Sequence, residues 1–219
     1  MLSRLLTGKE KRKTRLHNYN GQLLDAAGFL YLPQSILTTL SLKLTNRRPE
    51  LPWLGFRAIK YLDHLIRPDW NILEFGSGMS TIWFARRCSS LVSIETNRAW
   101  HSAVTAMLAQ RGLQNVDYRI VTQSEGHLLE DREDSSFDLV LVDGVSRDQA
   151  MVTALKKVKP GGYVYLDNSD MPYAAHRSAR AILLRAAGEE GNVRIFNDLS
   201  PTRIFVNEGI LAQVPRKPG

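Results

Sequence analysis

The chain of 219 residues has a single cysteine and lacks any long apolar run. One thiol, Cys88, excludes an internal disulfide, and its place in a predicted helical stretch favours a buried structural thiol over a reactive one. No apolar run approaches the roughly 18–20 residues that cross a bilayer, and the first residues lack the apolar stretch of a signal peptide. We therefore expect a cytoplasmic protein.

Acidic side chains are scarce at the start of the chain. Before residue 16 only Glu10 offsets six basic residues, which are Arg4, Lys9, Lys11, Arg12, Lys13 and Arg15. Most of the formal net charge of +7 therefore lies in this segment. Such a segment predicts a solvated extension, or one that attracts RNA or an anionic membrane surface. No aromatic residues are interleaved with these charges, so a base-stacking surface is not indicated.

Short apolar runs alternate with helical stretches between Asn71 and Asn207. This pattern predicts an α/β fold with a doubly wound, mostly parallel sheet covered by helices on both faces. We expect seven strands, beginning near residues 71, 91, 116, 137, 162, 192 and 202, and helices near 81–87, 98–111, 125–129, 147–158 and 173–187. The last two strands are joined by only four residues, 198–201, which is too short for a crossover helix. They must pair as an antiparallel hairpin.

Two further helices are expected before the sheet. Ile36, Leu37 and Leu40 indicate a short amphipathic helix, and a second runs from Ala58 to Ile66 before Pro68 ends it. The expected organisation is a basic extension over 1–18, a helical cap over 19–68, a nucleoside-binding domain over 69–209 and a tail over 210–219.

The first motif with chemical content is EFGSGMST, Glu74 to Thr81, where the first strand turns into a helix. Gly76 and Gly78 permit a tight turn and close approach of a ligand to the backbone. Glu95 ends the next strand 19 residues after Gly76, the distance at which an acidic side chain reaches ribose hydroxyls. The motif predicts a nucleoside site. A purely structural turn with an exposed glutamate is the alternative.

Two residues argue against a dinucleotide at this site. Thr81 stands where a dinucleotide fingerprint needs a third small residue. The carboxylate of Glu74 would repel a pyrophosphate, whereas it would attract the ammonium and sulfonium groups of S-adenosylmethionine. We therefore predict S-adenosylmethionine rather than NAD.

At this point the chain resembles the class I S-adenosylmethionine-dependent methyltransferases. The resemblance covers Asn71 to Asn207 and rests on ILEFGSGMST, VSIE, FDLVLVDG, the KPGG turn at 159–162 and the closing hairpin. It implies that the cofactor is bound by Glu74, Gly76, Ser77, Gly78, Ser80, Thr81 and Glu95, with Ser124 and Glu125 against the adenine and Asp143 facing the methyl group.

A narrower resemblance covers FDLVLVDG and KPGGYVYLDNSD, which are similar to segments of the catechol and caffeoyl-CoA O-methyltransferases. It implies that Asp143, Asp167 and Asn168 hold Mg²⁺ or another divalent cation, which would orient the acceptor hydroxyls. The lysine expected as general base is missing. Arg147 stands nearby, stays protonated and would hold an anionic substrate. Asp143 and Arg147 are the candidate catalytic residues; alternatively, Asp143 and Asp167 only cap strand ends.

The resulting hypothesis is O-methylation of a small hydroxylated molecule, such as a sugar, a glycan precursor or a phenolic compound. One alternative is an RNA methyltransferase that uses the basic N-terminal segment, although Val142-Asp143-Gly144 lacks the proline pair of enzymes that methylate base amines. Another alternative is a catalytically silent module that binds a nucleoside or a protein partner. His127 and His176 follow strands and are candidate bases.

Overall fold

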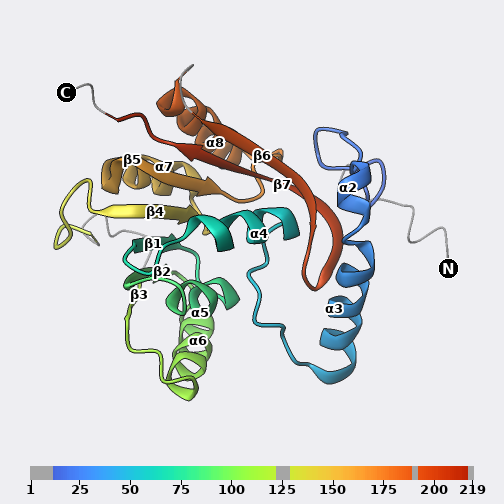
Figure 1. Cartoon of the computed structure of the whole chain (residues 1–219), viewed down its shortest axis with the longest axis horizontal. Helices are drawn as coiled ribbons and strands as arrows, with labels where there is room; N and C mark the ends of the chain where they lie inside the picture. Colours follow the sequence, from blue (N-terminus) through green and yellow to red (C-terminus); the bar gives the residue numbers. More distant parts are fainter. Residues whose placement is uncertain (1–11, 122–128, 189–191, 217–219) are drawn as a thin grey trace.

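The computed structural model describes residues 12–121, 129–188 and 192–216, and its centre is a seven-stranded sheet (Figure 1). The strand order is β3-β2-β1-β4-β5-β7-β6. Neighbouring strands from β3 to β5 run parallel, and β7 runs antiparallel to both β5 and β6. The bounds are β1 Asn71–Phe75, β2 Ser90–Glu95, β3 Val116–Ile120, β4 Phe137–Val142, β5 Val158–Leu166, β6 Val193–Ser200 and β7 Arg203–Gln213. The predicted doubly wound sheet with a closing hairpin is confirmed.

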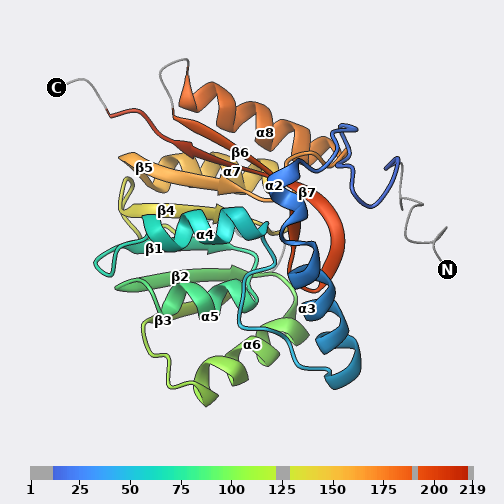
Figure 2. The same cartoon turned by 45° about the vertical axis from the view of Figure 1, so that its right-hand side comes forward.

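Helices cover both faces of this sheet (Figure 2). One face carries α4 (Phe56–Leu65), α5 (Met79–Ala85) and α6 (Arg98–Gln110), and the other carries α7 (Arg147–Lys157) and α8 (Ala174–Ala187). The helix expected at 125–129 falls mostly outside the described residues. The N-terminal part of the chain adds α2 (Ala26–Phe29) and α3 (Leu32–Thr45).

Side chains of each strand alternate between two apolar cores. Ile72 and Leu139 point into the core under α4 and α5, whereas Leu73 and Val140 point into the core under α7 and α8. All four are fully buried. Because both faces are covered, the strands read as continuous apolar runs rather than as alternating ones. Because β3, β2, β1, β4 and β5 run parallel, their carboxyl ends lie at the same edge of the sheet.

The helix expected around Ile36 forms as α3 and packs against the β6–β7 hairpin, beyond the end of the parallel strands (Figure 1). Its polar side faces the hairpin, because the hairpin presents carbonyl groups that need donors. The Ser35 hydroxyl donates to the carbonyl oxygens of Ser200 and Arg203, at 3.3 and 2.9 Å. Leu37 and Leu44 point outward and are 66% and 82% exposed.

The described part of the basic N-terminal segment lies against β7, which differs from the solvated extension expected there. The amide of Val206 donates to the carbonyl of Arg15 at 3.0 Å. Arg12 donates to the side-chain oxygen of Asn207 at 2.8 Å, and the Arg12 and Arg15 guanidinium groups stack on the Phe205 ring. The rest of the segment, up to residue 11, lies outside the described residues.

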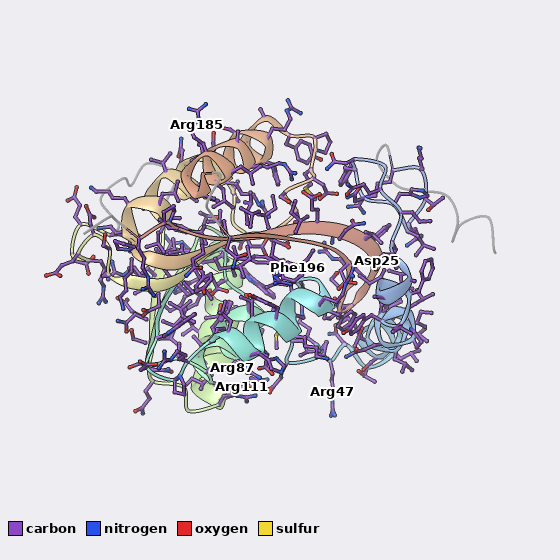
Figure 3. The ribbon with its side chains drawn as sticks, turned by 45° about the horizontal axis from the view of Figure 1, so that its top comes forward. Asp25, Arg47, Arg87, Arg111, Arg185 and Phe196 are labelled. Carbon is purple, nitrogen blue, oxygen red and sulfur yellow. The ribbon has the colours of Figure 1, made fainter. Side chains whose placement is uncertain are left out.

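Arg57 joins the cap to the hairpin from the first turn of α4. Its guanidinium contacts the buried carboxylate of Asp198 at 3.2 Å and the carboxylate of Asp25 at 2.7 Å. Asp25 lies near the end of the hairpin, and Phe196 lies between α4 and the sheet (Figure 3). These contacts fix the cap against the carboxyl edge of the sheet.

The C-terminal strand is longer than the sequence predicts. β7 continues to Gln213, and its last residues Ile210, Leu211 and Ala212 are buried between β5 and β6. The segment from 210, expected as a tail, therefore completes the sheet. Among the described residues, no helix is long and apolar enough to cross a membrane.

Candidate functional site

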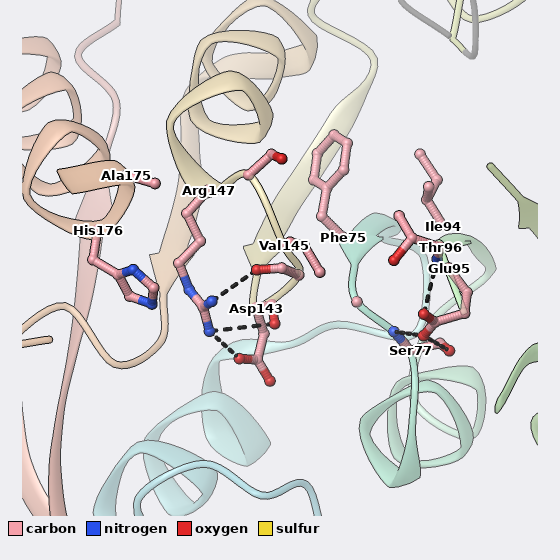
Figure 4. A pocket seen from close by; sticks show the side chains of 13 residues that line it. Phe75, Ser77, Ile94, Glu95, Thr96, Asp143, Val145, Arg147, Ala175 and His176 are labelled. Carbon is pink, nitrogen blue, oxygen red and sulfur yellow. Dashed lines mark hydrogen bonds and ion pairs between the residues drawn. The ribbon is translucent and has the colours of Figure 1, made fainter. Parts of the chain in front are cut away.

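A pocket of about 460 Å³ lies at the carboxyl ends of β1, β2 and β4 (Figure 4). Ser77, Glu95 and Thr96 stand on one side, and Asp143, Arg147 and His176 stand on the other. Its remaining lining residues are Phe75, Gly76, Ile94, Gly144, Val145, Ser146 and Ala175. The topology therefore brings the predicted nucleoside motif and the predicted catalytic residues into one cavity.

The glycine turn after β1 needs Gly76 for a steric reason. Its φ is +93°, and a Cβ at this position would lie 2.7 Å from the backbone nitrogen of Gly144. Real Cβ atoms essentially never come so close to backbone, so a side chain here would push the β1 and β4 loops apart. The turn thus holds two loops in contact on the floor of the pocket.

Glu95 is only 8% exposed, and its carboxylate is held by backbone and side-chain donors. One oxygen accepts from the amides of Thr96 and Asn97, both at 2.8 Å, and the other accepts from the amide and hydroxyl of Ser77 at 3.2 and 2.7 Å. Four donors fill the acceptor capacity of a carboxylate. A ribose diol that binds Glu95 must therefore replace the Ser77 donors.

Two aromatic residues that the sequence analysis did not single out position Ser77. The indole N–H of Trp100 donates to the Ser77 carbonyl oxygen at 2.9 Å, and the Tyr118 hydroxyl lies 2.6 Å from the Ser77 hydroxyl. Both residues lie on elements next to the turn, α6 and β3. No local sequence motif marks them, because their contact with Ser77 is set by tertiary packing.

Glu74, Ser80 and Thr81 support the turn from behind. Glu74 is fully buried, and one of its oxygens accepts from the hydroxyls of Thr81 and Ser93, each at 2.6 Å. Burial raises the pKa of Glu74 from 4.5 to about 7. None of the three is among the described residues that line the pocket. The structure thus gives Glu74 a position under the turn rather than the expected one beside the cofactor's charges.

Arg147 connects the ends of β4 and β5. One guanidinium nitrogen lies 2.6 Å from the Asp143 carboxylate and 3.4 Å from the side-chain oxygen of Asn168. The others donate to the carbonyl oxygens of Gly144 at 2.7 Å and of Asp167 at 3.2 Å. The residue is only 9% exposed. Its position at the first turn of α7 follows from the short loop after β4.

Burial raises the pKa of Asp143 and, more strongly, the pKa of Asp167. For Asp143 the nearby Arg147 charge opposes this increase, whereas for Asp167 the charge of Asp143 adds to it. The Asp167 carboxyl also forms a side-chain hydrogen bond that favours the charged form of Asp143. Burial and the repulsion between the two carboxylates therefore both favour a proton on the pair, most strongly on Asp167, and the Arg147 guanidinium offsets the negative charge that remains.

The oxygen atoms expected to hold a divalent cation do not fit one in this arrangement. Arg147 already supplies a positive charge to Asp143 and Asn168, and burial, which raises the pKa of Asp167, weakens the second of the two carboxylate ligands. Magnesium prefers several oxygen ligands, and it is usually held by ionised carboxylates. Within the described residues no cluster of three or more His, Cys, Asp or Glu side chains has a geometry that would hold a metal.

His176 lines the pocket from the first turn of α8. Both ring nitrogens are buried and have no hydrogen-bond partner among the described residues. Burial, followed by the charge of Arg147, lowers the pKa of His176 to about 4, so the ring is neutral at physiological pH. Ser124, Glu125 and His127 lie outside the described residues. Of the two candidate bases, His176 lies within the described residues and lines this cavity.

Comparisons with known proteins identify a related domain family and related folds. Residues 73–169 match the model of a family described as "Methyltransferase domain". No curated protein sequence matches the chain.

Many solved structures share the fold. An O-methyltransferase from Bacillus cereus, in complex with SAH, is 19% identical with a TM-score of 0.62, and the alignment covers 84% of this chain and 90% of that one. The cofactor-bound protein Rv0187 from MTB is also 19% identical with a TM-score of 0.62, covering 84% and 98%. A SAM-dependent O-methyltransferase from Thermotoga maritima is 14% identical with a TM-score of 0.57, covering 83% and 72%. The resemblance of this chain to the class I S-adenosylmethionine-dependent methyltransferases is thereby confirmed: residues 73–169 match a methyltransferase-domain model, and the fold is that of the solved methyltransferases.

Proposed function

We propose that the protein transfers the methyl group of S-adenosylmethionine to a hydroxyl of a small molecule, such as a sugar, a glycan precursor or a phenolic compound. One observation carries this proposal. The cavity joins a glycine turn and an oriented glutamate to an ion pair and a neutral histidine, at the carboxyl edge of a methyltransferase domain. Ligands of open α/β sheets bind at this edge.

The residues of the cavity divide into two groups. Gly76 and Ser77 would contact the cofactor through backbone, and Glu95 would accept hydrogen bonds from its ribose, after the Ser77 donors have moved away. Bound S-adenosylmethionine supplies an electrophilic methyl group on a positively charged sulfur. Asp143 lies on the opposite side of the pocket, where its carboxylate would favour positive charge and accept a hydrogen bond from the acceptor.

His176 is the residue that we assign to the proton. A ring nitrogen of His176 would take the proton of the acceptor hydroxyl, while bound S-adenosylmethionine would supply the methyl group to the acceptor oxygen and leave as S-adenosylhomocysteine. The ring is neutral at physiological pH and neither nitrogen has a hydrogen-bond partner among the described residues, so one nitrogen is available to accept the proton, as a weaker base than an ordinary histidine. Alignment of the two reactants in the pocket would supply a large part of the rate.

The cofactor assignment can be tested by calorimetric titration with S-adenosylhomocysteine and, separately, with NADH. We expect only the first to bind, and we expect Glu95→Ala to weaken it by about 10- to 100-fold, since a hydrogen bond to a charged group contributes about 1.5–3 kcal/mol. The exposed variant Glu133→Ala is the matched control and should bind like the wild type. Binding of neither ligand would mean that the glycine turn is structural.

The reaction can be tested with a panel of hydroxylated acceptors and mass spectrometry of the products. His176→Asn should lower kcat by about 10²–10⁴-fold and leave the affinity for S-adenosylhomocysteine unchanged, because general-base catalysis has that magnitude. The exposed variant His64→Asn serves as the control. Cofactor binding without turnover on any acceptor would favour a silent nucleoside-binding module.

A further inference from the structure

Four side chains from three distant segments gather beside the pocket, and we call them the tryptophan–arginine cluster: Arg48, Trp53, Trp100 and Arg203. The rings of Trp53 and Trp100 lie 6.4 Å apart. The Arg48 guanidinium carbon lies 4.9 Å from the Trp53 ring centre and 4.8 Å from that of Trp100. The Arg203 guanidinium carbon lies 5.3 Å from the Trp53 ring centre. The loop before α4, the first turn of α6 and the start of β7 thus converge here.

The cluster adjoins both sides of the pocket. Trp100 donates to the Ser77 carbonyl oxygen, and a Cβ added to Gly78 would lie 3.9 Å from the Trp100 ring. At the opposite side, the positive charge of Arg203 lowers the pKa of Asp143, which requires the two groups to lie within electrostatic reach. A molecule bound on the cluster would therefore lie next to the region between Ser77 and Asp143.

Among the described residues, neither arginine of the cluster forms a close ion pair with a carboxylate, and Asp143 acts on Arg203 only at longer range. By contrast, Arg57, Arg87 and Arg111 each place a guanidinium nitrogen 2.7 Å from a carboxylate oxygen. Arg48 and Arg203 are both exposed, and both stack on the ring of Trp53, so two like charges share one aromatic residue. An anion between them would relieve this repulsion and accept guanidinium hydrogen bonds in pairs.

Trp53 adds a second and independent observation. Its indole N–H is buried and has no acceptor within the described part of the chain. Buried donors are normally hydrogen-bonded, and leaving one without a partner costs free energy. A ligand oxygen next to the ring would satisfy this donor. The indole faces would at the same time contact a flat or apolar ligand body.

We propose that the tryptophan–arginine cluster binds the negatively charged group of the methyl acceptor. The acceptor would therefore be an anion. Its carboxylate, phosphate or sulfate group would bind Arg48 and Arg203, and its planar body would pack against Trp53. This inference rests on the proposed function, because it specifies the acceptor of the same site. In this proposal the cluster binds the negative charge of the substrate. Arg147, which donates to residues at the ends of β4 and β5, instead balances the charge of Asp143.

The test measures anion binding to the intact protein saturated with S-adenosylhomocysteine. The probes are inorganic phosphate, phenyl phosphate and benzoate, with benzyl alcohol as the neutral control, and binding is followed by calorimetry and by tryptophan fluorescence. We expect phenyl phosphate and benzoate to bind at least tenfold more tightly than benzyl alcohol. The double variant Arg48→Gln/Arg203→Gln should abolish this preference, and Trp53→Phe should weaken phenyl phosphate more than inorganic phosphate.

Arg47→Gln provides the matched control. Arg47 is the exposed neighbour of Arg48 (Figure 3), and its substitution removes the same charge. It should leave the preference for anions intact. The proposal is overturned if no anion binds saturably, if the double variant retains the preference, or if Arg47→Gln loses it equally. A double variant that binds S-adenosylhomocysteine weakly would also overturn it, because the arginines would then hold the cofactor carboxylate. Failure of the proposed function shows up separately, as absent cofactor binding by the wild type.

Discussion

The guanidinium of Arg147 lies 2.6 Å from the carboxylate of Asp143, on the side of the pocket that faces Ser77 and Glu95. The two side chains are only 10% and 29% exposed. A pair this sheltered is expensive to break, because removing one partner leaves an uncompensated charge in a poorly solvated place. The pair is therefore both a structural link between β4 and β5 and the source of charge balance in the site.

We expect Arg147→Met to lower the free energy of unfolding by about 3–5 kcal/mol, the usual cost of breaking a buried pair. Adding Asp143→Asn should recover part of this loss, because the neutral amide no longer needs a cation. Chemical denaturation of the single and double variants measures both effects. Arg185→Met, at an exposed arginine on α8 (Figure 3), should change stability by less than about 0.5 kcal/mol. Equal losses in the single and double variants would contradict the charge-balance argument.

The same ion pair predicts how the protein responds to divalent cations. Because Arg147 already neutralises Asp143 and contacts Asn168, we expect no saturable Mg²⁺ binding in calorimetry. Treatment with a chelator should leave the melting temperature unchanged, and methyl transfer should change by less than about twofold. Magnesium binding that disappears in Asp143→Asn would revive the metal site that the narrower resemblance implies.

Much of this fold follows from local sequence patterns. Leu73 and Val140 lie in continuous apolar runs, which only a sheet covered on both faces can bury, and the four residues after Asn197 leave no room for a crossover helix. Glu95 was assigned from its spacing to Gly76, and both line one pocket. Periodicity and turn chemistry thus predict which elements exist and which edge carries the site.

Other features depend on contacts that no local pattern contains. α3 was expected as an amphipathic helix, yet Ser35 faces the hairpin because its hydroxyl satisfies carbonyl groups there. Glu74 was expected beside the cofactor, but alternation along β1 directs it into the interior, toward Thr81. Arg147 was not predicted to contact Asn168 because these residues meet only when β4 and β5 pair. Such contacts depend on the register of distant segments.

The glycine turn offers a sharp test of backbone constraint. Gly76→Ala should destabilise the protein by about 3 kcal/mol or more, since the new Cβ would meet the Gly144 and Asp143 backbone at 2.7–2.8 Å in addition to the cost of a positive φ. Gly112→Ala is the matched control: its φ is +63° and nothing lies within 4 Å of the added Cβ. It should cost only about 1–2 kcal/mol, the conformational term alone. If denaturation gave the same loss of unfolding free energy for both variants, the close approach of the two loops would not contribute to the effect of Gly76→Ala.

Glu74 predicts a pH dependence of stability. Burial raises its pKa from 4.5 to about 7, so between these values the folded protein keeps a proton that the unfolded chain has lost. The folded state then binds more protons than the unfolded state, and the free energy of unfolding falls as pH rises through this window. The shift corresponds to about 3 kcal/mol. This contribution is fully present below pH 4.5 and is lost above pH 7.

Glu74→Gln removes this titration while keeping an acceptor for Thr81 and Ser93. The free energy of unfolding of the variant minus that of the wild type should therefore be larger at pH 8 than at pH 5, by about 2–3 kcal/mol. Denaturant titrations of both proteins at the two pH values measure it. Glu133→Gln, at an exposed glutamate, should follow the wild type at both. Parallel pH profiles for wild type and Glu74→Gln would mean that Glu74 is already ionised at pH 5, held in that form by the hydroxyls around it.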